Sequence, residues 1–154
     1  MSVRLEVSAE IDAPLPAVWN ELIDWEGQSR WIPLTTVRVI NDHDVGVGVR
    51  AEALSGIRLG QVPVGLLDRF IVTGWSPPAG DSAELEILHL GPYFTGEGGF
   101  RLDGHDGSTT VSCTELFSVP GGRPVEWLAR LIMPVLRAGF VRSLRALAAI
   151  VEVR

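Results

Sequence analysis

The chain has 154 residues, 46% hydrophobic and 21% charged, which is typical of a single folded domain over residues 1–154 and excludes a disordered chain. A net charge of −6, with no concentrated basic patch, disfavours nucleic acid as a partner, and the lone Cys113 excludes an internal disulfide and a thiolate metal cluster. No apolar stretch reaches the ~18 residues of a membrane span, and the acidic start lacks a signal peptide's apolar core, so we expect a cytoplasmic protein.

The N-terminal region predicts one strand and two short helices. Residues 3–11 alternate between apolar and polar side chains, as a half-buried strand does. Residues 14–23 carry apolar side chains at three- and four-residue spacing, which predicts an amphipathic helix. Trp25 and Trp31 bracket a polar stretch that we interpret as a second short helix, ended by Pro33.

The middle of the chain is rich in strand patterns separated by turn residues. Short segments of Gly, Pro, Asp and Ser join the strands, which favours an antiparallel meander over a parallel α/β sheet. Within the third strand of the chain, residues 45–53 alternate valine or alanine with glycine and charged residues. The six expected strands cover residues 36–41, 45–53, 62–75, 83–90, 94–102 and 109–119.

From residue 121 to the end, the sequence predicts one long helix. Apolar residues gather on one side and arginines on the other at ~100° per residue. Pro134 predicts a kink, and Gly139 and Ser143 place small side chains on the side expected to be buried. These small residues either leave room for a ligand or let the helix approach a sheet closely.

The order of these elements resembles the START/Bet v 1-like proteins of the SRPBCC superfamily, and within it the bacterial polyketide cyclase/dehydrase-like family. The resemblance implies an α+β helix-grip fold, in which a curved seven-stranded antiparallel sheet wraps around a long C-terminal helix. Two short helices follow the first strand, and a hydrophobic cavity lies between sheet and helix. It rests on Ala13, Pro14, Val18, Trp19 and Trp31 in EIDAPLPAVWNELIDWEGQSRWIP, and on the strings VGVGVRAEAL, LLDRFIVTGWSPP, GSTTVSCTELFSVP and SLRALAAIVE.

Because this superfamily includes carriers, receptors, cyclases and chaperone cofactors, function must be argued from the site. His89 and Glu115 are polar residues that fall in register with apolar, inward-facing positions of their strands. A neutral imidazole can donate to or accept from a ligand, and a desolvated carboxylic acid has a raised pKa. Alternatively, the register leaves His89 near solvent, and Glu115 sits at a bulge or beside an arginine.

Other polar residues have two interpretations each. Glu97 lies in FTGEGGF, where bare glycines indicate either a ligand close to the backbone or a sharp bend of the sheet. Tyr93 is either an anchor at the cavity mouth or a surface residue. Asp68 and Arg69 are expected to form cross-strand pairs.

We expect a small hydrophobic molecule as the partner, such as a lipid, isoprenoid, polyketide or aromatic compound, held by a carrier or sensor. The chain would be a monomer or homodimer and would need no metal or cofactor. One alternative is an aromatase/cyclase-like enzyme with His89 and Glu115 as candidate catalytic residues; another is a protein-interaction module. The residues expected to contact the ligand are Trp31, Leu85, Ile87, His89, Tyr93, Val111, Cys113, Glu115, Phe117, Ile132, Leu136, Gly139, Phe140 and Ser143.

Overall fold

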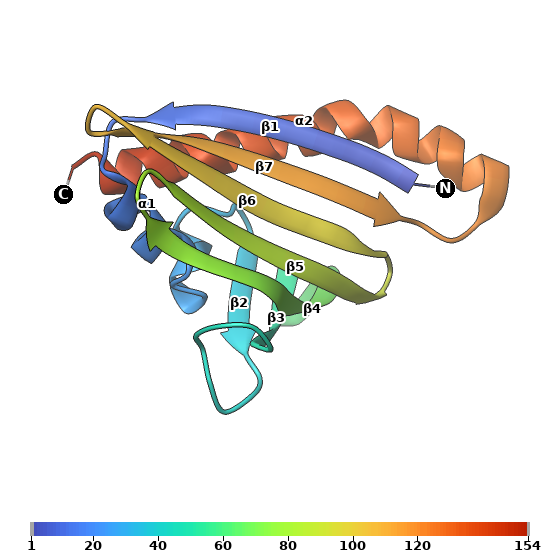
Figure 1. Ribbon diagram of the computed structural model, residues 1–154. Helices are drawn as coiled ribbons and strands as arrows, with labels where there is room; N and C mark the ends of the chain where they lie inside the picture. Colours follow the sequence, from blue (N-terminus) through green and yellow to red (C-terminus); the bar gives the residue numbers. More distant parts are fainter. Residues whose placement is uncertain (1, 154) are drawn as a thin grey trace.

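A computed structural model describes residues 2–153, apart from the side chain of Glu126. One antiparallel sheet is combined with a long C-terminal helix and two short helical segments (Figure 1). The elements in chain order are β1 (Ser2–Ile11), α1 (Leu15–Leu22), the 3-10 helix η1 (Glu26–Arg30), β2 (Thr35–Val39), β3 (Arg50–Leu59), β4 (Val62–Ala79), β5 (Ser82–Pro92), β6 (Thr95–His105), β7 (Ser108–Ser118) and α2 (Gly122–Val151).

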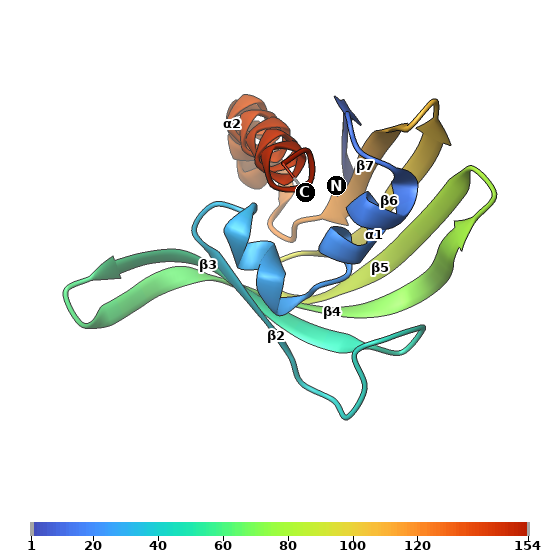
Figure 2. The same ribbon diagram turned by 90° about the vertical axis from the view of Figure 1, so that its left-hand side faces the viewer.

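The seven strands form a meander that is completed by the first strand. Their order in the sheet is β1-β7-β6-β5-β4-β3-β2, and every neighbouring pair is antiparallel. All the helices lie on one face of the curved sheet, which we call the concave face (Figure 2). The expected α+β helix-grip architecture is therefore confirmed, with both short helices between β1 and β2. None of the helices described here is long and apolar enough to cross a membrane.

The alternation of side chains along each strand explains the core. On β5, Leu85 and Ile87 are buried beneath the helices, whereas Glu84 and Glu86 point to the outer face and are exposed. Burial of one apolar row per strand supplies the main driving force for this layer arrangement. The resulting core reaches from β1 through α1 to the C-terminal half of α2.

The prediction of a strand over residues 45–53 is wrong in its first half. Strand β3 begins at Arg50 and continues to Leu59, while residues 45–49 form a loop. Gly46 and Gly48 adopt φ values of 94° and 93°, which turn the chain out of the extended conformation. Val45 and Val47, which alternate with them, are exposed, so their spacing reflects a loop and not a buried row.

Candidate functional site

Three ionisable side chains form a continuous hydrogen-bonded chain on the concave face. Nδ1 of His89 lies 2.7 Å from Oδ2 of Asp68, and Nε2 lies 2.9 Å from Oε2 of Glu115. The side chains of His89 and Glu115 are each 9% exposed, and that of Asp68 is 13% exposed. We refer to these residues as the Asp68–His89–Glu115 cluster.

The strand register brings these residues together from three different strands. His89 is on β5 and Glu115 on β7, so β6 runs between them. Neighbouring strands are ~4.8 Å apart, so the two side chains must meet across the backbone of β6. Gly98 permits this, because a Cβ at this position would lie 2.5 Å from Oε2 of Glu115. The bare glycine face in FTGEGGF therefore accommodates the Glu115 carboxylate.

Asp68 reaches His89 from the neighbouring strand β4. Phe70 is the residue paired with His89, and an irregularity in the ladder separates Arg69 from Phe70. Arg69 points to the other face, where its Nε donates to Oε1 of Glu52 at 3.0 Å. Asp68 and Arg69 therefore both form cross-strand pairs, but they do so on opposite faces of the sheet. The period-two pattern that joins Asp68 to Phe70 is the sequence signal that identifies its face.

Aromatic rings surround the cluster. The ring of Phe94 lies 5.1 Å from the His89 ring between centroids, and that of Phe70 lies 6.5 Å away. Phe117 packs against Phe94 at 5.8 Å. The imidazole and carboxylate groups of the cluster therefore lie within an apolar wall. This wall is near the end of the sheet at which β7 leads into α2 (Figure 1).

The surroundings shift the pKa values of the cluster. Burial alone would lower the pKa of His89, but hydrogen bonds with Asp68 and Glu115 outweigh it and raise the pKa to about 9. Desolvation raises the pKa of Glu115, and the contact with His89 opposes this only in part. The imidazole is therefore an imidazolium at neutral pH, in which both ring nitrogens carry a proton and donate to a carboxylate.

The cluster can hold and transfer protons, and it carries unused hydrogen-bonding capacity. Oδ1 of Asp68 is buried without a hydrogen-bond partner among the described residues, and so is Nε1 of Trp31.

The two carboxylates flank opposite sides of the imidazole, so they do not converge on one point as metal ligands would. In the part of the chain that the structure describes, no group of three His, Cys, Asp or Glu side chains is arranged to hold a metal ion.

The structure places the residues expected to contact a ligand in different surroundings. Tyr93, Ile132 and Gly139 are exposed, and a Cβ at Gly139 would have nothing within 4 Å. The Ser143 hydroxyl donates to the carbonyl of Gly139 at 3.0 Å, within the helix. Those that are buried or half-buried are Trp31, Leu85, Ile87, His89, Val111, Cys113, Glu115, Phe117, Leu136, Phe140 and Ser143. Burial raises the pKa of the Cys113 thiol well above its usual value, which makes it unreactive.

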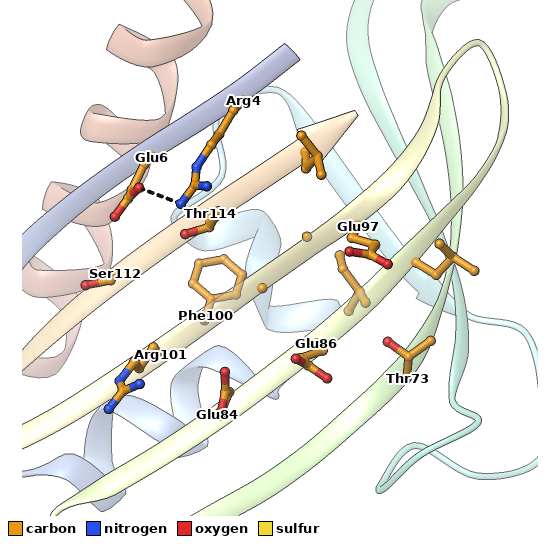
Figure 3. Close-up of a pocket in the computed structure, with 15 residues that line it drawn as sticks. Arg4, Glu6, Thr73, Glu84, Glu86, Glu97, Phe100, Arg101, Ser112 and Thr114 are labelled. Atoms are coloured by element: carbon orange, nitrogen blue, oxygen red, sulfur yellow. Dashed lines mark hydrogen bonds and ion pairs between the residues drawn. The ribbon is translucent and has the colours of Figure 1, made fainter. Parts of the chain in front are cut away.

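A hollow of about 680 Å³ lies on the outer face of the sheet, with the helices behind it (Figure 3). Four carboxylates and two guanidinium groups line it, from Glu6, Glu84, Glu86, Glu97, Arg4 and Arg101. This charged lining is unsuited to an apolar ligand. A second hollow, of about 320 Å³, is formed by residues of β2, β3 and β4 with Leu34. Neither hollow lies between the sheet and α2, so the cavity expected there stays a prediction.

No family model matches the sequence, and no curated protein matches it. Solved structures do match over nearly the whole chain. A protein of Thermus thermophilus gives a TM-score of 0.76 at 16% identity, covering 98% of both chains. The Zhui aromatase/cyclase from Streptomyces sp. R1128 gives 0.70 at 18% identity, covering 100% of this chain and 97% of its own. Ara h 8.0201 gives 0.71 at 11% identity, with both chains fully covered.

The chain has the helix-grip fold. The polyketide cyclase-like and Bet v 1-like resemblance found in the sequence is thus confirmed at the level of fold. The Asp68–His89–Glu115 cluster lies on the concave face of this scaffold. At identities below one fifth, the similarity extends to the scaffold and not to a particular substrate.

Proposed function

We propose that this helix-grip protein binds a small hydrophobic molecule against its concave face, as a carrier or sensor. The observation that carries the proposal is the buried Asp68–His89–Glu115 cluster within an aromatic wall. Burying ionised groups costs free energy of desolvation, and apolar replacements of similar volume often make a protein more stable. A cluster of this kind is therefore more typical of a functional site than of a structural element.

The chemistry of the wall indicates the class of ligand. Phe94 and Phe117 offer apolar area, which contributes ~25 cal/mol per Å² of ligand surface buried, before ordering costs. At the polar end, both N–H groups of the His89 imidazolium already donate to carboxylates, and the other oxygens of Asp68 and Glu115 can accept a hydrogen bond from a ligand hydroxyl. We therefore propose a mostly apolar molecule with one oxygen function, such as a polyketide, isoprenoid or lipid fragment.

Mass spectrometry of the purified protein under native conditions tests this proposal, together with a screen of apolar and aromatic compounds for thermal stabilisation. We expect a retained small molecule or a compound that raises Tm. Glu115→Gln should weaken that binding by roughly 10- to 150-fold, because a charge-assisted hydrogen bond contributes about 1.5–3 kcal/mol. Glu86→Gln makes the same chemical change on the outer face and should leave binding unchanged. The proposal fails if neither method detects binding.

A second candidate is proton-transfer catalysis of the aromatase/cyclase type, favoured by the 2.9 Å contact between His89 and Glu115. Two groups in direct contact can exchange a proton and present it to a bound carbonyl compound. The test is cyclisation of a polyketide-like poly-β-ketone by the protein and by His89→Asn. Turnover that the variant loses while it still binds the substrate supports catalysis. Unchanged turnover in the variant excludes His89 from this role.

A further inference from the structure

Two tryptophans flank the 3-10 helix η1 and differ in one hydrogen bond. Trp25 and Trp31 are both buried, at 4% and 2% exposure, and each packs on a phenylalanine of the sheet. The indole Nε1 of Trp25 donates to the backbone carbonyl of Asp44 at 2.7 Å. The indole Nε1 of Trp31 is buried as well, but it has no hydrogen-bond partner among the described residues.

The unpaired indole N–H of Trp31 calls for an acceptor. Nearly all buried donors in folded proteins are paired with protein, water or ligand atoms, so each exception needs an explanation. The ring of Phe100 packs edge to face with Trp31, at 6.4 Å between centroids, and offers no oxygen or nitrogen acceptor. Because an indole N–H can only donate, it is available to an acceptor atom of a bound molecule.

Trp31 lies next to the Asp68–His89–Glu115 cluster. Phe100, on which it packs, is two residues from Gly98 on β6, so both positions are on the concave face. The Glu115 carboxylate lies against Gly98. Two residues of a strand span ~6.6 Å, so Phe100 and the Glu115 carboxylate are about one such step apart along β6.

The second unpaired atom is at the other end of the cluster. Oδ1 of Asp68 is a buried acceptor, and in the part of the chain that the structure describes it and Nε1 of Trp31 are the two buried side-chain atoms without a partner. The carboxylate of Asp68 bonds to the ring nitrogen of His89 that faces away from Glu115. The free donor is therefore nearest to Glu115, and the free acceptor is beyond His89.

We propose that the ligand of the concave face has two polar ends, a hydroxyl that donates to the cluster and an acceptor oxygen that accepts from Nε1 of Trp31. A hydroxy ketone with a flat apolar middle has this chemistry, because Ile87 and Phe100 line the floor between the two ends. The inference rests on the proposed function and adds a second oxygen to that ligand. A ketone without a hydroxyl would leave the carboxylate oxygens without a donor, and a carboxylic acid would be repelled by them.

Three probes on one skeleton test the two ends separately. 4-Hydroxybenzophenone has both groups, benzophenone lacks the hydroxyl, and 4-benzylphenol lacks the carbonyl. Isothermal titration calorimetry of the full chain measures their affinities. We expect 4-hydroxybenzophenone to bind at least tenfold more tightly than benzophenone, because the hydroxyl donates to a charged acceptor, and roughly fivefold more tightly than 4-benzylphenol.

One substitution removes the indole N–H and keeps an aromatic ring. Trp31→Phe should weaken binding of 4-hydroxybenzophenone roughly fivefold and leave the affinity for 4-benzylphenol nearly unchanged. The ratio of the two affinities is the readout, since any loss of packing from the smaller ring affects both probes alike. Trp25→Phe is the matched control, because it removes an indole N–H that is already bonded to Asp44 and should leave the ratio unchanged.

Several results would overturn this inference. One is an affinity ratio that is the same in Trp31→Phe and in the unsubstituted protein, which would assign the indole N–H to a buried water. Another is benzophenone that binds as tightly as 4-hydroxybenzophenone, which would exclude the hydroxyl contact. If none of the probes binds although other compounds of the screen do, the two-ended ligand is wrong and the proposed function stands. If no compound binds at all, the proposed function fails and this inference fails with it.

Discussion

The two halves of α2 have similar apolar content but different surroundings. From residue 140 onward the helix packs on β1 and α1, and Leu144, Leu147 and Val151 are at most 3% exposed. From residue 127 to residue 135 the apolar side chains are largely exposed, and so are Ile57, Leu59, Val62 and Val64 on the concave face at the end of the β3–β4 hairpin. The difference shows that one end of the helix-grip core is closed by protein, while the other, open end leaves apolar side chains exposed.

Leucine truncations at the two ends should give the largest contrast. Leu147→Ala removes a side chain with no exposed area and should lower the free energy of unfolding by about 2–5 kcal/mol. Leu131→Ala, in the same helix and 56% exposed, should change it by less than about 0.5 kcal/mol. Urea unfolding of both variants measures these values. Similar losses at both positions would mean that the open end is packed in solution.

The cluster at the open end should make stability depend on pH. The pKa of His89 is about 9 in the folded chain, compared with 6.5 for the free side chain, which corresponds to about 3 kcal/mol. Because the folded pKa is the higher one, this stabilisation is complete below pH 6.5 and is lost as pH rises through 9. The groups that face the imidazole are Asp68 and Glu115.

Chemical denaturation at pH 6 and above pH 9 measures this effect, since the two values bracket the shift. His89→Gln keeps a hydrogen-bonding side chain but cannot carry the charge, so it should lose most of the pH dependence in this range. His105 and Cys113, whose pKa values are also raised in the folded chain, remain in that variant and account for the residual change. A wild-type curve that is flat between the two pH values would contradict the charged state assigned to His89.

A methyl group added at Gly98 should disrupt the cluster. The expected loss of stability is smaller than the contribution of the His89 charge. The added Cβ of Gly98→Ala would lie 2.5 Å from the Glu115 carboxylate, which must then move away from His89. We expect a loss of about 1–3 kcal/mol and a His89 pKa closer to its ordinary value, measured by NMR titration of the ring. Gly99→Ala is the matched control, because its Cβ would approach the carbonyl of Leu85 on the other side of the strand. An unchanged His89 pKa in Gly98→Ala would contradict the role given to this glycine.

Much of the fold could be predicted from the sequence, because alternation and turn residues act locally. The contact between His89 and Glu115 could be predicted only as a candidate pair, since its register follows from strands far apart in the chain. The face on which Asp68 lies could be predicted from its two-residue spacing to Phe70, but its place beside His89 could not, because the ladder irregularity next to it sets the register. Exposure of Ile132 could not be predicted either, because helical spacing identifies a face of the helix but does not show whether another element covers it.

Gly139 lies between the two ends of α2, and its substitution is expected to have the smallest effect on stability. It lies inside α2 with nothing within 4 Å of an added Cβ, so Gly139→Ala should stabilise the protein by about 0.5–1 kcal/mol through helix propensity. The same variant reports on the expected cavity, since a ligand that packs against this backbone would meet the new methyl group. Thermal unfolding with and without a compound from the binding screen separates the two cases. Stabilisation with unchanged affinity places the ligand deeper, toward Phe140 and the cluster, whereas weaker binding assigns Gly139 to the ligand site.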